Sequence, residues 1–199
     1  MMKSILFLPY FGNIEFFHVL MKSEEAIFEI WDTYPKQTFR NRTVILGANG
    51  PLNLSVPVIK PNGSKSKTCE IRIDYTDDWQ KNHIKSIESA YKNSPFYDYF
   101  DREIMALINS KEELLIDKNQ KILEFVSKTF CIDTNTSISE SYIKDSNLHD
   151  YRQILSPKKK TDFKTHEYIQ VFSDRFEFQN NLSILDLLFN EGPNAISFL

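Results

Sequence analysis

The sequence has few of the residues that cross-link a chain or interrupt its helices and strands: two cysteines, five glycines and eight prolines in 199 residues. Cys69 and Cys131 are far apart, and neither has a Cys or His neighbour at ligand spacing, which argues against a disulfide framework and a zinc site. So little Gly and Pro excludes a collagen-like or low-complexity chain. We therefore expect two reduced thiols in a cytoplasmic globular protein without a metal site.

Long apolar runs are also missing. No stretch approaches the ~18 apolar residues of a membrane-spanning helix. The apolar run 5–8 ends at Pro9, which is too short for the core of a signal peptide, and no small-residue cleavage site follows. We expect this run to be a buried first strand, and we expect no membrane span.

Charge of one sign is not in excess. The chain carries 24 Lys and Arg against 27 Asp and Glu, a formal net charge of −3. A nucleic-acid-binding domain usually has a basic surplus gathered on one face, so we expect no nucleic-acid partner. Glycine-rich phosphate loops, dinucleotide fingerprints, zinc-protease motifs and nucleophile elbows are all absent, and the sequence identifies no cofactor.

Aromatic residues, by contrast, are abundant, with sixteen Phe and nine Tyr, so we expect a core built from rings. Residues 5–8 have the pattern of a strand covered on both faces. The chain then turns before Asn13, which is suited to cap a helix that runs to residue 20. Residues 26–31 have a second strand pattern, and the succession is typical of a βαβ unit.

The remaining chain mixes hairpin and helix signals. Asn49-Gly50 between apolar runs predicts a hairpin, whose loop Pro51 should lengthen. Strands are predicted at 42–46, 52–58 and 70–75, a polar loop at 131–148, extended segments at 151–157 and 168–172, and helices at 79–91, 96–108, 114–130 and 182–190. We predict an α/β fold: an N-terminal βαβ-like unit with a mixed sheet flanked by helices.

A cluster of cations is the first candidate site. In an extended chain Lys36, Arg40 and Arg42 would share one face with Thr38 between them, and three converging cations suit a phosphate or carboxylate. The alternative is a solvated strand edge, where such cations discourage edge pairing. A second basic run, residues 158–160, has the pattern of a solvated turn or of a functional patch.

His83 and Asp186 are the second and third candidates. His83 lies one turn after Trp79 on the apolar stripe of its helix, so it faces inward, either hydrogen-bonded in the core or lining a pocket as a general base. Asp186 and Asn190 are four residues apart on an apolar helix. A carboxylate there must be paired or exposed, or it contacts a ligand.

Several segments, in order along nearly the whole chain, resemble the WbqC-like family. They are residues 36–42, Ala48–Leu52 with Ser55–Val58, Trp79 with His83 and Ala90–Tyr91, Ser94–Tyr97, Tyr168–Phe172, and Asn181–Ala195. The closing segment is the most specific. The family opens with Gln-Pro-Tyr where this chain has Leu8-Pro9-Tyr10, so a contact made by that Gln would be missing here. The match is closest to the branch found in Bacteroides-type bacteria.

The resemblance implies one WbqC-like domain over residues 1–199 and a role in bacterial surface-polysaccharide (O-antigen) biosynthesis. It suggests a transferase of acyl or aminoacyl type, acting on a nucleotide-linked amino sugar or another small-molecule ligand. On this basis we expect catalytic roles for His83 and Asp186. The substrate-binding residues that we expect are Tyr10, Lys36, Arg40, Asn41, Arg42, Trp79, Tyr91 and Asn190.

Two other functions stay open. Because recognisable catalytic motifs are missing, the chain also suits a non-catalytic accessory or ligand-binding protein of a glycan pathway. A nucleotidyl transferase is less favoured, since Gly12 is followed by Asn13-Ile14-Glu15 without a His-x-Gly-His-like signature. The enzymatic hypothesis requires Arg42, His83 and Asp186 to meet around one hollow.

Overall fold

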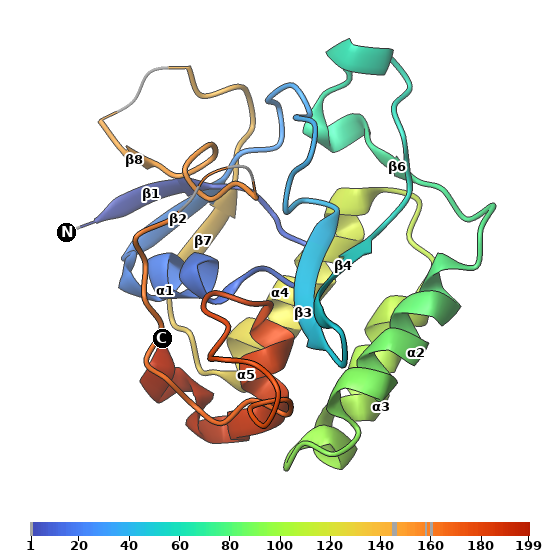
Figure 1. Cartoon of the computed structure of the whole chain (residues 1–199). Coiled ribbons are helices and arrows are strands. Elements are labelled where there is room, and N and C mark those ends of the chain that lie inside the picture. The colour runs from blue at the N-terminus through green and yellow to red at the C-terminus, as the bar shows by residue number, and fades with distance from the viewer. Residues whose placement is uncertain (1, 145–146, 158, 160) are drawn as a thin grey trace.

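The predicted α/β architecture is confirmed by the computed structural model, which describes residues 2–144, 147–157, 159 and 161–199. A parallel sheet forms one side of the molecule, helices α2 and α3 form the other, and the hairpin β3–β4 lies between them (Figure 1). Within the described residues the sheet is flanked by five α-helices. None of the described helices has the length and apolar character needed to cross a bilayer.

The N-terminal βαβ unit is present. Strand β1 (Lys3–Leu6) leads into helix α1 (Ile14–Lys22), and strand β2 (Glu25–Phe28) returns parallel to β1 in the register Lys3↔Glu25 to Leu6↔Phe28. Asn13 caps the helix, since its Oδ1 accepts a hydrogen bond from the Phe16 amide at 3.3 Å. The apolar face of α1 is buried, which fixes the helix against the sheet and the C-terminal segment.

Two further parallel strands complete this sheet. Strand β7 (Asn135–Ile138) pairs with β2, and strand β8 (His149–Asp150) pairs with β1, which gives the order β7-β2-β1-β8. The prediction that 131–148 is only a loop was wrong, because β7 lies in it. The prediction of an extended segment at 151–157 was also wrong, because β8 ends at Asp150 and turns follow it.

The predicted hairpin is formed by β3 (Arg42–Gly47) and β4 (Gly50–Ser55), with Gly47 opposite Gly50. Its loop is therefore the two residues Ala48 and Asn49, shorter than expected, because Pro51 lies inside β4 rather than in the loop. Gly50 has a φ of +104°, a backbone angle that residues other than glycine rarely adopt. Beyond the hairpin, two short strands pair antiparallel, β5 (Val58–Ile59) and β6 (Arg72–Ile73).

The helices follow the predicted periodicity to within a few residues. They are α2 (Trp79–Tyr91), α3 (Tyr97–Asn109), α4 (Leu115–Thr129) and α5 (Ile184–Glu191), together with the 3₁₀ helices η1 (Gly63–Lys65), η2 (Thr68–Glu70) and η3 (Gly192–Phe198). The extended segment predicted at 168–172 is not a strand. The chain between β2 and β7 forms the hairpin β3–β4, the strands β5 and β6 and the helices α2 to α4. Helix α4 leads back to β7.

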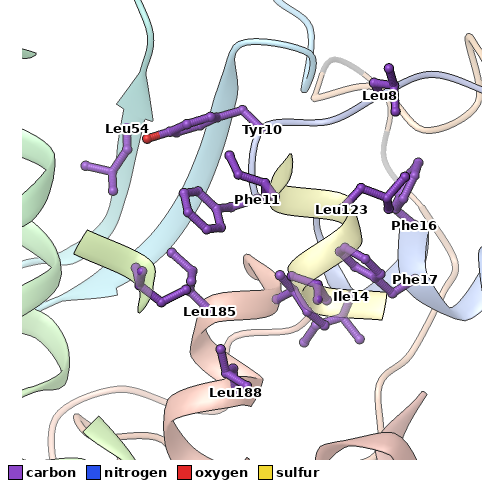
Figure 2. Close-up of a cluster of buried hydrophobic side chains, with 14 of the residues drawn as sticks. Leu8, Tyr10, Phe11, Ile14, Phe16, Phe17, Leu54, Leu123, Leu185 and Leu188 are labelled. Carbon is purple, nitrogen blue, oxygen red and sulfur yellow. The ribbon is translucent and has the colours of Figure 1, made fainter. Parts of the chain in front are cut away.

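The core is rich in rings, as composition predicted. Figure 2 shows Tyr10 and Phe11 of the turn after β1 lying between β4 and α1, above the Leu side chains of α5. Phe11, Phe16 and Phe17 are completely buried. Truncating one such ring to alanine costs about 3–5 kcal/mol. The β1–α1 turn is therefore part of the core.

Candidate ligand-binding site

A cavity of about 700 Å³ opens at the carboxyl ends of the parallel strands. Trp31 and Asp32 follow β2, Tyr142 follows β7, and Arg152 and Gln153 follow β8. Ligands of open parallel sheets sit at this edge, near the point where neighbouring strands continue in opposite directions. In the order β7-β2-β1-β8 this point lies between β1 and β8, because the chain leaves β1 towards β2, away from β8.

The lining of this cavity is strongly cationic. Five of the described lining side chains are basic and one is acidic, Asp32; the basic ones are Lys36, Arg40, Lys67, Arg152 and Lys159. Lys36 and Lys159 are exposed and form no ion pair with any other residue that the structure describes. A net excess of positive charge in a concave site attracts phosphate and carboxylate groups.

Arg40 is the buried member of the set, with its side chain 2% exposed. Its Nη2 lies 2.6 Å from Asp32 Oδ2, and its Nη1 donates to Thr38 Oγ1 at 3.2 Å. The guanidinium also covers the ring of Phe7 at 4.6 Å from the centroid. Burial lowers the pKa of Arg40, and Asp32 opposes this. The Nε of Arg40 is buried and has no partner among the described residues.

Asp32 is held in place by the segment that carries Lys67. Asp32 Oδ1 accepts a hydrogen bond from Thr68 Oγ1 at 2.5 Å, and the Thr68 amide donates to the Asp32 carbonyl at 2.9 Å. Ser66 accepts from the Tyr34 amide in the same ladder. These bonds fix Lys67 at the rim, where its Nζ lies 5.2 Å from the centroid of the Trp31 ring.

Arg152 is oriented by two carboxylates. Its Nη2 lies 2.6 Å from Asp150 Oδ2, and its Nη1 lies 3.5 Å from Glu29 Oε2. Glu29 is fully buried and also accepts hydrogen bonds from the amides of Trp31 and Ile143, both at 2.7 Å. One carboxylate therefore joins the loops after β2 and β7 to the arginine after β8. The charge of Arg152 is largely compensated, so its main effect is to shape the site.

The N-terminus of α1, where many α/β proteins hold a phosphate, is already occupied. The Ile14 amide donates to the Leu182 carbonyl at 3.0 Å, and the Glu15 amide donates to Asn181 Oδ1 at 2.9 Å. The Phe16 amide is taken by Asn13. An anion would find no free donors in this first turn, so the cationic side chains of the cavity are the better anion site.

The 36–42 segment is not extended, so the alternation assumed from the sequence was wrong. Gln37 has φ +53° and the chain turns at Phe39 and Arg40 before β3 begins. Lys36 and Arg40 nevertheless line the same cavity, with Thr38 between them, whereas Arg42 is not among its lining residues.

The neighbours of Arg40 in this segment take structural positions. Asn41 Nδ2 donates to the Val56 carbonyl at 2.8 Å, which ties the segment to the end of β4. The Nε of Arg42 is buried without a partner among the described residues. Of the basic run 158–160, Lys159 lines the cavity, while residues 158 and 160 lie outside the described residues.

His83 lies in a closed aromatic environment on α2 and is 4% exposed. Its Nδ1 is 2.9 Å from the hydroxyl of Tyr10, and its ring packs edge-on against Trp79 with centroids 5.1 Å apart. Burial lowers the pKa of His83 to about 4, and a hydrogen bond with the backbone of Ser55 opposes this. With its pKa held this low, the ring is neutral at pH 7.

Asp186 lies in a separate network. Its carboxylate accepts hydrogen bonds from Tyr91 Oη at 3.0 Å, Tyr168 Oη at 2.6 Å and Gln170 Nε2 at 3.0 Å. Burial raises the pKa of Asp186, and these donors oppose this. Asn190 Nδ2 donates to the Asp186 carbonyl at 2.8 Å, and Asn190 also lines a cavity of about 570 Å³ on that side.

His83 and Asp186 are thus each closed by their own partners, and the expected single hollow around residues 42, 83 and 186 is not formed. Among the predicted site residues, the structure brings together Lys36 and Arg40 in the cationic cavity. It groups Tyr10 with Trp79 and His83, and Tyr91 with Asp186.

Sequence reasoning missed Trp31, Lys67, Tyr142 and Arg152 as lining residues. The signal that was available is position: residues that follow parallel strands gather at one sheet edge. It went unused because β7 is polar and β8 has only two residues. In the described part of the chain, no group of three or more His, Cys, Asp or Glu side chains is arranged to hold a metal ion.

The fold and cavity define an α/β protein with a cation-lined pocket at the carboxyl edge of a parallel sheet. The sequence profile of the WbqC-like protein family matches residues 6–162, and the chain belongs to this family. That range includes every residue that lines the cationic cavity. No curated protein and no solved structure match the chain significantly.

Proposed function

We propose that the protein binds a nucleotide-linked sugar in the cationic cavity and acts as a transferase in the synthesis of a bacterial surface polysaccharide. The observation that carries the ligand class is the excess of positive charge in a single cavity: Arg40 and Arg152 are paired with carboxylates, but Lys36, Lys67 and Lys159 form no ion pair with another described residue. Membership of the WbqC-like family supports the acyl or aminoacyl transfer that the sequence resemblance suggests. Nucleotide-linked precursors would place this activity in the cytoplasm.

The cavity has the parts that such a ligand needs. The exposed amino groups of Lys36 and Lys159 offer donors and charge for a diphosphate. Trp31 and Tyr142 add ring faces on which a base or sugar can stack. The Trp31 ring is fixed, since its Nε1 donates to the Ser139 carbonyl at 2.8 Å. A volume of about 700 Å³ is typical of small-molecule sites.

Isothermal titration tests the ligand class, with UDP, dTDP, GDP, pyrophosphate and the corresponding nucleotide sugars as probes. Lys36→Ala and Lys159→Ala each remove one exposed charge, so we expect each to raise the Kd about three- to tenfold. The affinity should also fall with added salt, because the contacts are ionic.

Lys111→Ala is the matched control, since Lys111 is an exposed lysine that does not line this cavity. It should leave the Kd unchanged. Absence of binding by every probe, or equal affinity in the Lys36, Lys159 and Lys111 variants, contradicts the proposal.

A second candidate function is ligand binding without catalysis. It is favoured by His83 and Asp186, which are buried and hydrogen-bonded within the protein rather than facing the cavity. In cells that depend on the protein for glycan display, a folded His83→Gln variant should then keep display, while Lys36→Ala with Lys159→Ala abolishes it. Loss of display in a folded His83→Gln variant that still binds the nucleotide probes contradicts this second candidate.

A further inference from the structure

A second cavity, of about 380 Å³, adjoins the cationic one. The two share Ser156 and Lys159, so the segment after β8 forms a wall of both. A ligand longer than the first cavity would therefore reach the second past these two residues. The second cavity lies at the start of α1, which provides Asn13 and Glu15.

The chemistry of this second cavity is different. Its polar lining is a carboxylate, three side-chain amides and two hydroxyls, and Lys159 is the only basic side chain among the described residues that line it. The Glu15 carboxylate is held rigidly, since Oε1 accepts from Thr161 Oγ1 at 2.7 Å and Oε2 accepts from Asn181 Nδ2 at 2.9 Å. Each of these oxygens has a second lone pair for another donor.

An anion is disfavoured in this place. The first-turn amides of α1 are bonded to protein acceptors, so the helix end offers no free donors, and the charge of Glu15 repels an anion. The matching group is neutral or positively charged and rich in hydroxyl or amino donors. Phe39 and Ile154 supply an apolar surface, with Ile154 53% exposed, and this suits the C–H face of a pyranose ring.

We propose that the second cavity is the sugar subsite, in which Glu15 accepts a hydrogen bond from a hydroxyl or ammonium group of the sugar. This inference rests on the proposed function, because the diphosphate in the first cavity brings the sugar within reach. The bridge is Lys159, which lines both cavities and lies between the charged end and the sugar end of the ligand.

The test compares a nucleoside diphosphate with its sugar conjugates by isothermal titration. The probes are UDP, UDP-glucose and UDP-glucosamine, or the dTDP or GDP set if that nucleotide binds more tightly. Glu15→Gln should weaken UDP-glucosamine about tenfold and UDP-glucose less, because the lost partner of the ammonium is a charge. Binding of UDP alone should be unchanged.

Two further variants distinguish a lost ligand contact from an effect on folding. Ile154→Ala removes an exposed apolar side chain and should weaken both conjugates but not UDP. Glu103→Gln, an exposed carboxylate on α3, is the matched control and should change nothing.

The outcomes separate the two proposals. If no nucleoside diphosphate binds the wild-type protein, the proposed function is overturned and the subsite with it. A different outcome overturns only the sugar subsite: UDP binding depends on Lys36 and Lys159, yet Glu15→Gln and Ile154→Ala change the Kd of UDP and of its sugar conjugates by the same factor.

Discussion

The environment of His83 leads to a quantitative prediction that also bears on its chemical role. The ring is buried between Tyr10 and Trp79, and burial holds its pKa at about 4, below its ordinary value of 6.5. In the unfolded chain the imidazole takes up a proton between pH 6.5 and 4, whereas in the folded protein it stays neutral over most of that range. The unfolded state then binds more protons, so stability must fall as the pH falls.

The size of the effect follows from this shift. One pKa unit corresponds to 1.36 kcal/mol, so a shift from 6.5 to about 4 amounts to roughly 3 kcal/mol. This contribution is fully present above pH 6.5 and is lost by about pH 4. Replacing His83 with Gln removes the titrating group. The variant should be about 1–3 kcal/mol less stable than wild type at pH 7.5, because the hydroxyl of Tyr10 loses its buried partner.

Urea denaturation from pH 7.5 to 4 measures the prediction. The stability difference between wild type and His83→Gln should shrink by roughly 3 kcal/mol, and it should close or reverse at the acid end. His166→Gln is the control, a substitution of an exposed histidine outside this aromatic cluster. Parallel curves for wild type and His83→Gln would refute the reasoning. They would mean that His83 titrates normally and is open to solvent, as a general base would be.

Two other buried networks give predictions of the same kind. Burial tends to raise the pKa of Glu112, but hydrogen bonds from Lys121, Lys118 and Ser110 outweigh it and lower the value to about 2. Its stabilisation is therefore present above about pH 4.5 and lost as the pH falls towards 2. Glu112→Gln should flatten this acid limb in denaturation curves and, by leaving the buried Lys118 uncompensated, cost about 3–5 kcal/mol at pH 7; a cost below 1 kcal/mol would contradict the pairing. Asp186→Asn replaces an acceptor of three hydrogen bonds with a group that also donates, so we expect a loss of about 1–3 kcal/mol by thermal or urea unfolding. Asp133→Asn, at an exposed position outside the helices and strands, is the control and should cause no comparable loss.

Much of the fold was predictable because it depends on local periodicity. The βαβ unit, the hairpin and the positions of α2 to α5 follow from apolar spacing and from capping residues such as Asn13. Strands β7 and β8 were not predictable in this way. The sequence Asn-Thr-Ser-Ile of β7 is polar and exposed at a sheet edge, and β8 has two residues, so neither carries the apolar signature of a parallel strand.

The candidate site was predictable only in part for the same reason. Lys36 and Arg40 stand out in sequence as basic residues near one another, and they do share a cavity. Arg152 reaches the same cavity through β8, and Lys67 reaches it through a backbone ladder with residues 30–34. These approaches depend on long-range pairing, which residue spacing does not encode. The inward position of His83 was predicted correctly from its stripe, but spacing could not distinguish a core ring from a pocket ring.

The β1–α1 turn explains why binding in this protein should depend on side chains rather than on backbone amides. A phosphate-holding turn keeps its amides exposed and its glycines open to the ligand. Here a Cβ on Gly12 would lie 2.9 Å from Pro9 Cγ, so the glycine serves close packing within the turn. Phe11 adopts φ +41°, and its carbonyl accepts hydrogen bonds from Thr43 and Ser183 at 2.6 and 3.0 Å. A turn fixed in this manner cannot open around a phosphate without breaking the core. Under the proposed function, anion binding would therefore depend on the long cationic side chains of the cavity, and we expect the affinity to depend strongly on salt and to fall with each lysine that is removed.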